Sequence, residues 1–551
     1  MNRYLFFAFI YFFIPAGAFA QAPFNTADSV NINRINARVL VHGDMFWNPE
    51  LGVAACEFPQ GSGKHINFAC ALWMSGYDNS GQLHVAAQTY RQTGNDYWPG
   101  PLTSDTLTYA NSQNWANIWK VNNSDIQTFL GLTTHTTINT PQSILTWPGK
   151  GNINAAGNGG VPLTIANGMA PFVDLNGNGI YEPLLGEYPD IKGDQALWWV
   201  FSDNGPSHTS SKGKPFGVEI HAMAYAYNRG TLIDNVIYFD YNIINRSPNT
   251  YNNTRIGLWD DIDLGWYYDD YIGFDSSHRM GIQYNGNNND GGGGGSPVNS
   301  YGTHVPMVGM TMIVLPGDSG TTYVPAGSFV YYNNDASIIG GAALDTQDNY
   351  SLRGKSWNGT SIANYMPATN HCRDHDTNQF YCFTGDPSDA GQCSECVLNN
   401  NPGDRRFILA SNDFSLNSGN SRHIVIALVT TNPDTLNGCP GASFDNIKTV
   451  ADTAWANYYN PPPQTAVKNI SINNSISIYP NPAFNELYIV NSNSTGDEYI
   501  AIYNSLGQKI YLPITKKNTG DIIDVSSLPP ALYYIVYRKD HVQKTAKFIK
   551  E

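Results

Sequence analysis

Alternating apolar and polar side chains predict β-strands along the middle of the chain. In GVEIHAMAYAYN, residues 217–228, every second side chain is small or aliphatic: Val218, Ile220, Ala222, Ala224 and Ala226. The stretches NVIYFDYNIIN, PMVGMTMIVLP and RHIVIALVTT predict further strands, and turns rich in Gly, Asn and Pro separate them. Many strands joined by such turns indicate a large β-sandwich.

Two stretches show helical periodicity instead. Residues 112–130 predict a short helix, because bulky apolar residues recur there at roughly helical spacing: Trp115, Ile118, Trp119 and Ile126. Residues 444–459 predict a better helix with a single apolar stripe: Ile447, Val450, Ala454 and Trp455. The following NPPPQT, residues 460–465, ends that helix and predicts a stiff linker.

Composition indicates an exported protein of more than one domain. The chain has 551 residues, too many for one ordinary core, and only 14 % of them are charged. With 34 Tyr and 24 Phe it has the profile of a β-rich extracellular protein. Residues 1–20 predict a secretory signal peptide, because Arg3 precedes a short apolar run that ends in Ala18-Phe19-Ala20. No later segment predicts a transmembrane span.

The formal net charge of −15 is unevenly distributed. From Ile470 onward there are 8 basic and 7 acidic residues, so the negative excess lies earlier in the chain. This balance argues against a nucleic-acid partner, which would need a basic face. It is compatible with cation binding and also with simple solubility.

Seven cysteines predict disulfides in an exported chain, with at least one thiol left over: Cys56, Cys70, Cys372, Cys382, Cys393, Cys396 and Cys439. HCRDH, residues 371–375, is similar to a metal-protease motif with Asp in place of Glu. That motif requires a helix, whereas the polar residues around HCRDH predict a loop. Zinc held by these His and Cys residues is the alternative to disulfides.

The last 80 residues or so contain four characteristic blocks in order: ISIYPNPAFNELYIV, YIAIYNSLGQKIY, IIDVSSLPPALYYIVYRKD and KTAKFIKE. This region resembles the type A C-terminal sorting domain of type IX secretion substrates in Bacteroidetes bacteria. It departs from the family at Ala531, where Gly is usual. The resemblance implies a small Ig-like β-sandwich and delivery by the type IX secretion machinery. It also implies removal by a sortase-like peptidase near residues 463–475.

Three parts are therefore expected along the chain. They are a signal peptide (1–20), a β-rich cargo region (21–465) and a C-terminal sorting domain (466–551), with an internal cargo boundary considered near 200–217. Cargo blocks such as WDDIDLGWYYDDYIGFD resemble segments of large uncharacterised secreted proteins of the same bacteria. That resemblance implies no activity.

DLNGNGIYEPLLGEYPD, residues 174–190, resembles a calcium loop with a displaced closing ligand. An EF-hand loop has Glu at position twelve, where this chain has Leu185. Calcium tolerates such a change because it accepts six to eight oxygens in flexible geometry. The predicted ligands are loop oxygens and one of two later acids: Asp174, Asn176, Asn178, Ile180, Glu187 and Asp190. The alternative is an Asx-rich turn without an ion.

Six aspartates occur within residues 260–275, and such carboxylates repel one another unless a cation or solvent separates them. The alternation in Asp261-x-Asp263-x-Gly265 is typical of a metal loop. A second calcium site is predicted from five of the six: Asp261, Asp263, Asp269, Asp270 and Asp275. A solvated acidic loop and a glycosidase carboxylate pair are the alternatives.

No complete catalytic constellation is recognisable in the sequence. We therefore expect a calcium-stabilised binding or adhesion protein, secreted or held at the outer-membrane surface, with an extracellular glycan or protein as ligand. A secreted hydrolase acting on polysaccharide or protein is the alternative.

Overall fold

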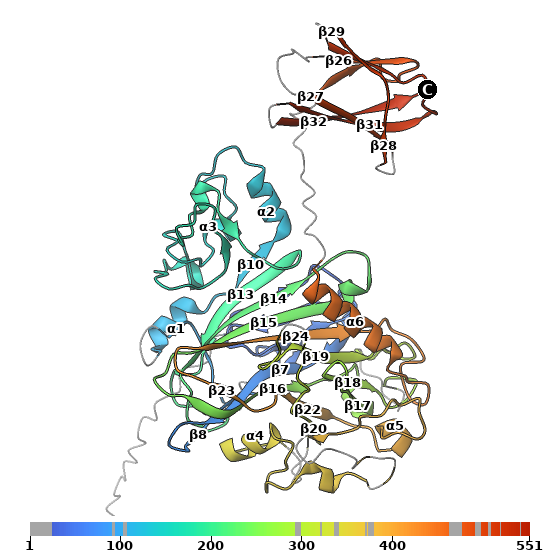
Figure 1. Cartoon of the computed structure of the whole chain (residues 1–551). Coiled ribbons are helices and arrows are strands. Elements are labelled where there is room, and N and C mark those ends of the chain that lie inside the picture. Colours follow the sequence, from blue (N-terminus) through green and yellow to red (C-terminus); the bar gives the residue numbers. More distant parts are fainter. Residues whose placement is uncertain are drawn as a thin grey trace, which may run out of the picture. The chain divides into compact units, whose positions relative to one another are not determined.

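The computed structural model describes residues 25–90, 94–102, 107–291, 299–319, 322–334, 341–367, 369, 372, 380–461, 476–490, 498–504, 508–517, 520–539 and 542–551. The chain forms two compact units that divide between Thr465 and Ala466 (Figure 1). Each unit is described by itself. The predicted signal peptide and the predicted cleavage region at 463–475 lie outside the described residues.

The cargo region is built on two large sheets (Figure 1). The nine-stranded sheet has the order β10 (Trp119–Asn122), β13 (Gln195–Ser202), β14 (Val218–Ala226), β15 (Val236–Asn245), β24 (Ser421–Thr430), β19 (Val308–Val314), β18 (Met280–Asn285) and β17 (Asp270–Asp275), with β9 (Trp98–Pro99) beside β13. The seven-stranded sheet has the order β21 (Phe380–Tyr381), β20 (Ser328–Asn333), β22 (Arg405–Ala410), β16 (Tyr251–Asp261), β7 (Ala69–Tyr77) and β8 (Leu83–Ala87), with β23 (Phe414–Leu416) beside β16.

One hydrophobic core joins the two sheets. It contains side chains from β13, β14, β15 and β24 of the larger sheet and from β7, β16, β20 and β22 of the smaller one. Phe274 of β17 stacks on Phe329 of β20 with ring centroids 4.9 Å apart. Gly281 of β18 lies so close to the other sheet that a Cβ there would meet Phe329 and Phe407 at 2.7–2.9 Å. The predicted mostly β, sandwich-type cargo region is therefore confirmed.

The alternation predicted for residues 218–226 is also confirmed. Val218, Ile220, Ala222, Ala224 and Ala226 all belong to the core between the sheets. The polar side chains between them face the opposite side of β14, because successive residues of a strand point to opposite faces. The segment between β13 and β14, where an internal boundary is considered, connects two antiparallel neighbours of one sheet.

The helix predicted at residues 444–459 is α6 (Asp445–Tyr459). Ile447, Val450 and Ala454 are buried, as its apolar stripe predicts. Trp455 is half-buried and donates from Nε1 to Thr311 Oγ1 of β19 at 2.9 Å. The helix thereby covers the outer face of the larger sheet at β24 and β19 (Figure 1).

The single helix expected over residues 112–130 is wrong. The segment forms α1 (Tyr109–Trp115), the strand β10, and α2 (Asn123–Leu130). Trp119 lies in β10 and pairs with Trp198 of β13, with ring centroids 5.6 Å apart. Pairing along the sheet edge therefore overrides the helical spacing of the apolar residues.

Smaller elements complete the cargo region. A four-stranded sheet has the order β1 (Ala27–Val30), β2 (Asn36–Leu40), β5 (Cys56–Glu57) and β6 (His65–Asn67). Two hairpins pair β3 (Trp47–Asn48) with β4 (Val53–Ala54) and β11 (Phe172–Val173) with β12 (Tyr188–Pro189). The remaining α-helices are α3 (Gln142–Leu145), α4 (Asp345–Ser351) and α5 (Glu395–Leu398). Short 3-10 helices are η1 (Asn158–Gly160), η2 (Pro183–Leu185), η3 (Leu232–Asn235), η4 (Tyr267–Asp269) and η5 (Ile362–Tyr365).

The C-terminal unit is a small β-sandwich, as predicted. One sheet has the order β25 (Ser477–Tyr479), β26 (Glu486–Val490), β30 (Gly520–Asp524) and β29 (Ile514–Lys517). The other has the order β28 (Lys509–Ile510), β27 (Glu498–Asn504), β31 (Ala531–Lys539) and β32 (Val542–Lys550). A separate core between them includes Leu487, Ile535 and Phe548. Among the described residues of the whole chain, none of the helices has the length and apolar character needed to cross a membrane.

Candidate metal centre

Two strands of the smaller sheet bring three carboxylates together. β16 ends at Asp261, Asp263 follows two residues later, and Asp404 immediately precedes β22. Because β16 and β22 are antiparallel neighbours, the end of one lies beside the start of the other. Carboxylate oxygens from the three residues lie within 4.8 Å of one another. Asp261 and Asp263 are predicted ligands, whereas Asp404 could not be recognised in advance because only strand pairing places it here.

The hydrogen bonds of this cluster leave two oxygens without donors. Asp261 Oδ2 accepts from Arg406 Nη2 at 3.0 Å and from the hydroxyl of Tyr90. Asp404 Oδ1 accepts from Arg406 Nη1 at 2.6 Å. By contrast, Asp261 Oδ1 and Asp263 Oδ1 are buried and have no hydrogen-bond partner among the described residues. Buried polar atoms are nearly always paired, so two such oxygens in one cluster make it a candidate site for a cation.

Burial has the largest effect on the pKa values of Asp261 and Asp263. It raises the pKa of Asp261 to about 6, although the Arg406 guanidinium opposes the change. Burial raises the pKa of Asp263 well above its ordinary value, and the charges of Asp261 and Asp404 raise it further. Arg406 alone therefore does not neutralise the three carboxylates, and a divalent cation would favour their ionised forms.

The donor set suits a hard cation. Carboxylate oxygens are the ligands that Ca²⁺ prefers, and calcium accepts six to eight oxygens in flexible geometry. Asp261, Asp263 and Asp404 would supply three carboxylates, and backbone carbonyls or water would complete the coordination shell. The residues present therefore fit calcium.

The other predicted ligands of this segment lie elsewhere. Asp270 Oδ2 accepts from Gln283 Nε2 at 2.6 Å and from the backbone of Leu264 at 3.2 Å. Asp269 Oδ2 accepts from the backbone of Gly291 at 3.0 Å. Asp269 Oδ1 and Asp270 Oδ1 are buried and unpartnered among the described residues, but neither belongs to the three-carboxylate cluster.

Asp275 lies at the far end of β17 from Asp270. Five residue steps of about 3.3 Å each separate Asp270 from Asp275, so the two aspartates do not share an ion. Asp275 instead accepts from Ser277 Oγ at 2.7 Å and lies 2.5 Å from His278 Nδ1. The structure thus distributes the five predicted aspartates over three places.

The loop at residues 174–190 is closed by its own hydrogen bonds. Asp174 accepts from the backbone N–H groups of Gly177 and Gly179, each at 2.7 Å. Asn176 Oδ1 accepts from the backbone of Asn178 at 2.9 Å, and Asn178 Oδ1 accepts from that of Ile180 at 2.7 Å. These contacts match the Asx-rich turn that was the alternative to calcium.

Glu187 closes this loop through hydrogen bonds to its backbone. It is fully buried, and its carboxylate accepts from the backbone N–H groups of Leu175 at 3.2 Å and Glu182 at 2.7 Å. Glu182, which was not predicted, accepts from the side-chain amides of Asn176 and Asn178. Asp190 lines a different pocket, on the outer face of the larger sheet.

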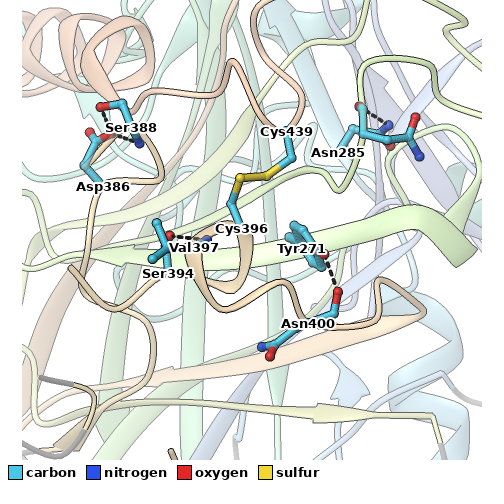
Figure 2. Close-up of a disulfide and its surroundings, with 10 residues drawn as sticks. Tyr271, Asn285, Asp386, Ser388, Ser394, Cys396, Val397, Asn400 and Cys439 are labelled. Atoms are coloured by element: carbon cyan, nitrogen blue, oxygen red, sulfur yellow. Dashed lines mark hydrogen bonds between the residues drawn. A yellow bond between two sulfur atoms is a disulfide. The ribbon is translucent and has the colours of Figure 1, made fainter. Parts of the chain in front are cut away.

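The clustered cysteines form disulfides, as the exported compartment predicts. Cys372 is bonded to Cys393, and Cys396 of α5 is bonded to Cys439 just before α6 (Figure 2). These bonds remove four thiols from any zinc site. Three free thiols are buried: Cys56, Cys70 and Cys382. His371 and His375 lie outside the described residues.

A pocket of 360 Å³ lies beside the metal cluster and shares Tyr90 and Arg406 with it. We call it the aromatic pocket, because four rings line it: Trp73, Tyr90, Trp259 and Tyr332. Trp73 and Trp259 are stacked with their planes 4° apart, and Tyr90 meets Trp259 edge-on at 5.1 Å. Trp259 donates from Nε1 to the hydroxyl of Tyr332 at 2.5 Å, which fixes both rings.

Comparison with protein families bears on the C-terminal unit. Residues 477–551 match the family model of the secretion system C-terminal sorting domain. The C-terminal unit is a sorting domain. The protein is therefore a type IX secretion substrate and is secreted or displayed at the cell surface.

The cargo region has no comparable assignment. The sorting-domain match leaves it uncovered, and comparison with curated proteins finds no match. Among solved structures, a polysaccharide lyase is similar over 60 % of this chain and 34 % of its own, with 7 % identity and a TM-score of 0.17. This chain thus spans 34 % of the lyase's length, and so low a score carries no argument about function.

Proposed function

We propose that the cargo region is a calcium-stabilised binding protein that the sorting domain delivers to the cell surface or the medium. The observation that carries the proposal is the pair of buried oxygens, Asp261 Oδ1 and Asp263 Oδ1, that have no donor in a three-carboxylate cluster. Calcium would offset their repulsion in the folded state alone and so raise its stability. The aromatic pocket beside the cluster supports a binding role, because pockets of this size commonly hold ligands.

Thermal melting of residues 21–465 in calcium and in chelator tests the calcium site. This fragment contains the cargo core, which is separate from that of the sorting domain. At a calcium concentration of about 100 times the Kd, the expected gain in the free energy of unfolding is about 2.7 kcal/mol. Extracellular calcium modules commonly bind with Kd values of roughly 10⁻⁴–10⁻³ M, so about 10–100 mM calcium reaches that ratio.

Asp263→Asn tests whether the cluster is the calcium site, because it should raise the melting temperature in chelator and reduce the rise that calcium causes. The variant should melt higher than the wild type in chelator, because one buried repelling charge is gone, and should lose most of the calcium effect. Asp389→Asn, at an exposed acid elsewhere, is the matched control and should leave both unchanged. Asp174→Asn reports separately on the loop at 174–190. Identical wild-type curves in saturating calcium and in chelator would contradict the proposal.

A second candidate function, a secreted hydrolase, is favoured by the pocket on the outer face of the larger sheet. The pocket has a volume of 470 Å³ and is lined by residues that include His221, Asp240 and His423. His221 and His423 both lie opposite Asn242, on β14 and β24. His423 Nε2 lies 2.7 Å from Asp240, and His221 Nε2 lies 2.8 Å from Glu219. An accessible imidazole held by a carboxylate is a common general base.

Activity assays on polysaccharide and protein substrates test this second function. His423→Ala should abolish hydrolysis if the pocket is catalytic. His304→Ala, at an exposed histidine in a loop, is the matched control. Absence of turnover by the wild type on both substrate classes would favour the binding function.

A further inference from the structure

Asp348 is a buried acid in the wall of the aromatic pocket. It lies in the first turn of α4 and is 4 % exposed, and its side-chain carboxyl group has no hydrogen-bond partner among the described residues. Burial raises its pKa well above the ordinary value, and the charges of Asp96 and Asp345 raise it further. The carboxyl group is therefore available to hydrogen-bond to a molecule inside the pocket.

The helix that carries Asp348 is held in place from several directions. Asn349 Nδ2 donates to the hydroxyl of Tyr77 at 3.0 Å. The carbonyl of Leu352 accepts from Arg255 at 3.0 Å and from Ser328 Oγ at 2.9 Å. α4 therefore presents Asp348 to the pocket from a fixed position, as a preorganised binding group requires.

The rest of the pocket combines flat apolar rings with polar groups. Lys212 and Asn334 are exposed and lie at the rim, with Thr209 and Ser210 beside them. Trp73 and Trp259 are almost fully buried, and their indole N–H groups are bonded to Gln88 O and to Tyr332, so they contribute ring carbon to the pocket wall. Tyr90 is half-buried and is the most exposed of the four rings. Flat rings with a few fixed polar groups suit a ligand that has apolar faces and polar edges.

Three ligand classes can be compared with this lining. An apolar side chain would leave Asp348 buried without a partner, which is unfavourable. A cationic side chain would meet Lys212 and Arg406, which line the same pocket. A sugar ring has C–H faces for the aromatic rings and hydroxyl groups that both donate to and accept from a carboxyl group.

We propose that the aromatic pocket binds one pyranose unit of an extracellular glycan, with Asp348 as its buried hydrogen-bonding group and the half-buried ring of Tyr90 as its main aromatic contact. The proposal deepens the proposed binding function, on which it rests, by naming the ligand class. The ammonium group of Lys212 at the rim would attract the carboxylate of a uronate. Lys212 therefore provides a test of whether the glycan is neutral or acidic.

Tryptophan fluorescence of the mature chain, residues 21–551, tests the proposal in saturating calcium. The probes are cello-, xylo-, manno- and chito-oligosaccharides and oligogalacturonate, each titrated to about 10 mM, ten times a 1 mM Kd. We expect at least one probe to give a saturable change. An oligogalacturonate signal that weakens in Lys212→Ala would identify an acidic glycan, whereas an unchanged signal with a neutral probe would identify a neutral one.

Variants of Asp348 decide whether the pocket is the site. Asp348→Leu should weaken binding of the responding probe at least about tenfold, or ~1.4 kcal/mol. Asp348→Asn keeps hydrogen-bonding capacity and should stay within about threefold of the wild type. Asp345→Leu, on the same helix but outside the pocket lining, is the matched control. If Asp348 were only structural, its variants would differ in melting temperature, but Asp348→Leu would not bind the probe more weakly than Asp348→Asn.

The proposal is overturned if no probe changes the fluorescence, or if Asp348→Leu binds as the wild type does. Its failure is distinguishable from failure of the proposed function. If no oligosaccharide changes the fluorescence but calcium raises the melting temperature and the chain is retained on immobilised extracellular proteins, the proposed binding function stands and the sugar ligand is excluded. If calcium does not change the melting temperature but an oligosaccharide still binds, the calcium site is excluded and the sugar-binding proposal stands.

Discussion

Glu395 and Arg405 form an ion pair that is almost completely removed from solvent. Arg405 Nη2 donates to Glu395 Oε2 at 2.8 Å and Arg405 Nε donates to Oε1 at 3.2 Å. Glu395 Oε1 also accepts from the backbone of Ile272 in β17 at 2.9 Å. The pair therefore links α5, β22 and β17, and each charge depends on the other because both side chains are buried.

At the residue scale, Glu395→Ala should lower the free energy of unfolding by on the order of 3–5 kcal/mol, because it leaves a buried guanidinium unpaired. The measurement is urea unfolding of residues 21–465. Asp28→Ala breaks the partly exposed pair with Lys120 and is the control, with an expected loss of about 0–1 kcal/mol. Equal losses of unfolding free energy in the two variants would show that the buried pair stabilises the fold no more than the exposed pair does.

At the scale of elements, the disulfide between Cys396 and Cys439 holds α5 to the turn before α6 (Figure 2). The two residues are 43 positions apart, so the bond closes a loop that contains β22 and β24. Cross-linking a loop of this length reduces the entropy of the unfolded chain by an amount worth about 4 kcal/mol.

Replacing both Cys396 and Cys439 by Ala should therefore lower the free energy of unfolding by about 2–4 kcal/mol. Denaturant unfolding under non-reducing conditions measures the loss. Cys382→Ala is the control, because it removes a buried thiol without breaking a cross-link. The double variant should also be insensitive to reductant at this bond, and a wild type unaffected by reduction would contradict the prediction.

The contact between His278 and Asp452 of α6 depends on pH. His278 lies 2.5 Å from Asp275 and 2.9 Å from Asp452 of α6, with its ring 6.1 Å from Trp455. Burial acts to lower the pKa of His278, but the hydrogen bonds to Asp275 and Asp452 outweigh it and raise the pKa. The folded state thus holds the His278 proton more tightly than the unfolded state.

The resulting stabilisation is fully present below the unfolded-state pKa of about 6.5 and is lost as pH rises through the higher folded-state value. His278→Gln should therefore cost about 1 kcal/mol at pH 5.5 and much less at pH 9. Asp452 is largely exposed, which keeps the effect small. Melting curves of both proteins at the two pH values provide the measurement, and a pH-independent difference would refute the assignment.

At the scale of the whole molecule, delivery and cargo are separate units with separate cores. The strands of the cargo sheets and α6 are all complete before residue 461. The cargo therefore does not need the sorting domain to form its core, whereas the sorting domain supplies the export signal.

Deleting residues 470–551 should leave the cargo folded but retained in the periplasm. Cell fractionation of full-length and truncated chains, with protease resistance as a test of folding, measures both properties. Mass spectrometry of the exported protein should find a new C-terminus near residues 463–475, produced by a sortase-like peptidase. Surface display of the truncated chain, or an exported protein that still ends at Glu551, would exclude this route.

The sequence by itself determines the features that depend on local periodicity or on contiguous blocks. Alternation at residues 218–226 defines the buried face of β14, and the stripe at 447–454 defines that of α6. The sorting domain is recognisable because its blocks are contiguous within about 75 residues. In each case neighbouring residues carry the whole signal, since side-chain direction follows from the period of the backbone.

Tertiary structure alone decides which distant residues meet. Asp404 joins Asp261 because β16 pairs with β22, and Cys439 rather than a nearer thiol pairs with Cys396. Asp348 reaches the aromatic pocket through the position of α4. The apolar spacing at 112–130 was misleading because pairing of β10 with β13 outweighed it. Strand partners far apart in the chain are chosen by the burial of whole sheet faces, and no local pattern encodes that choice.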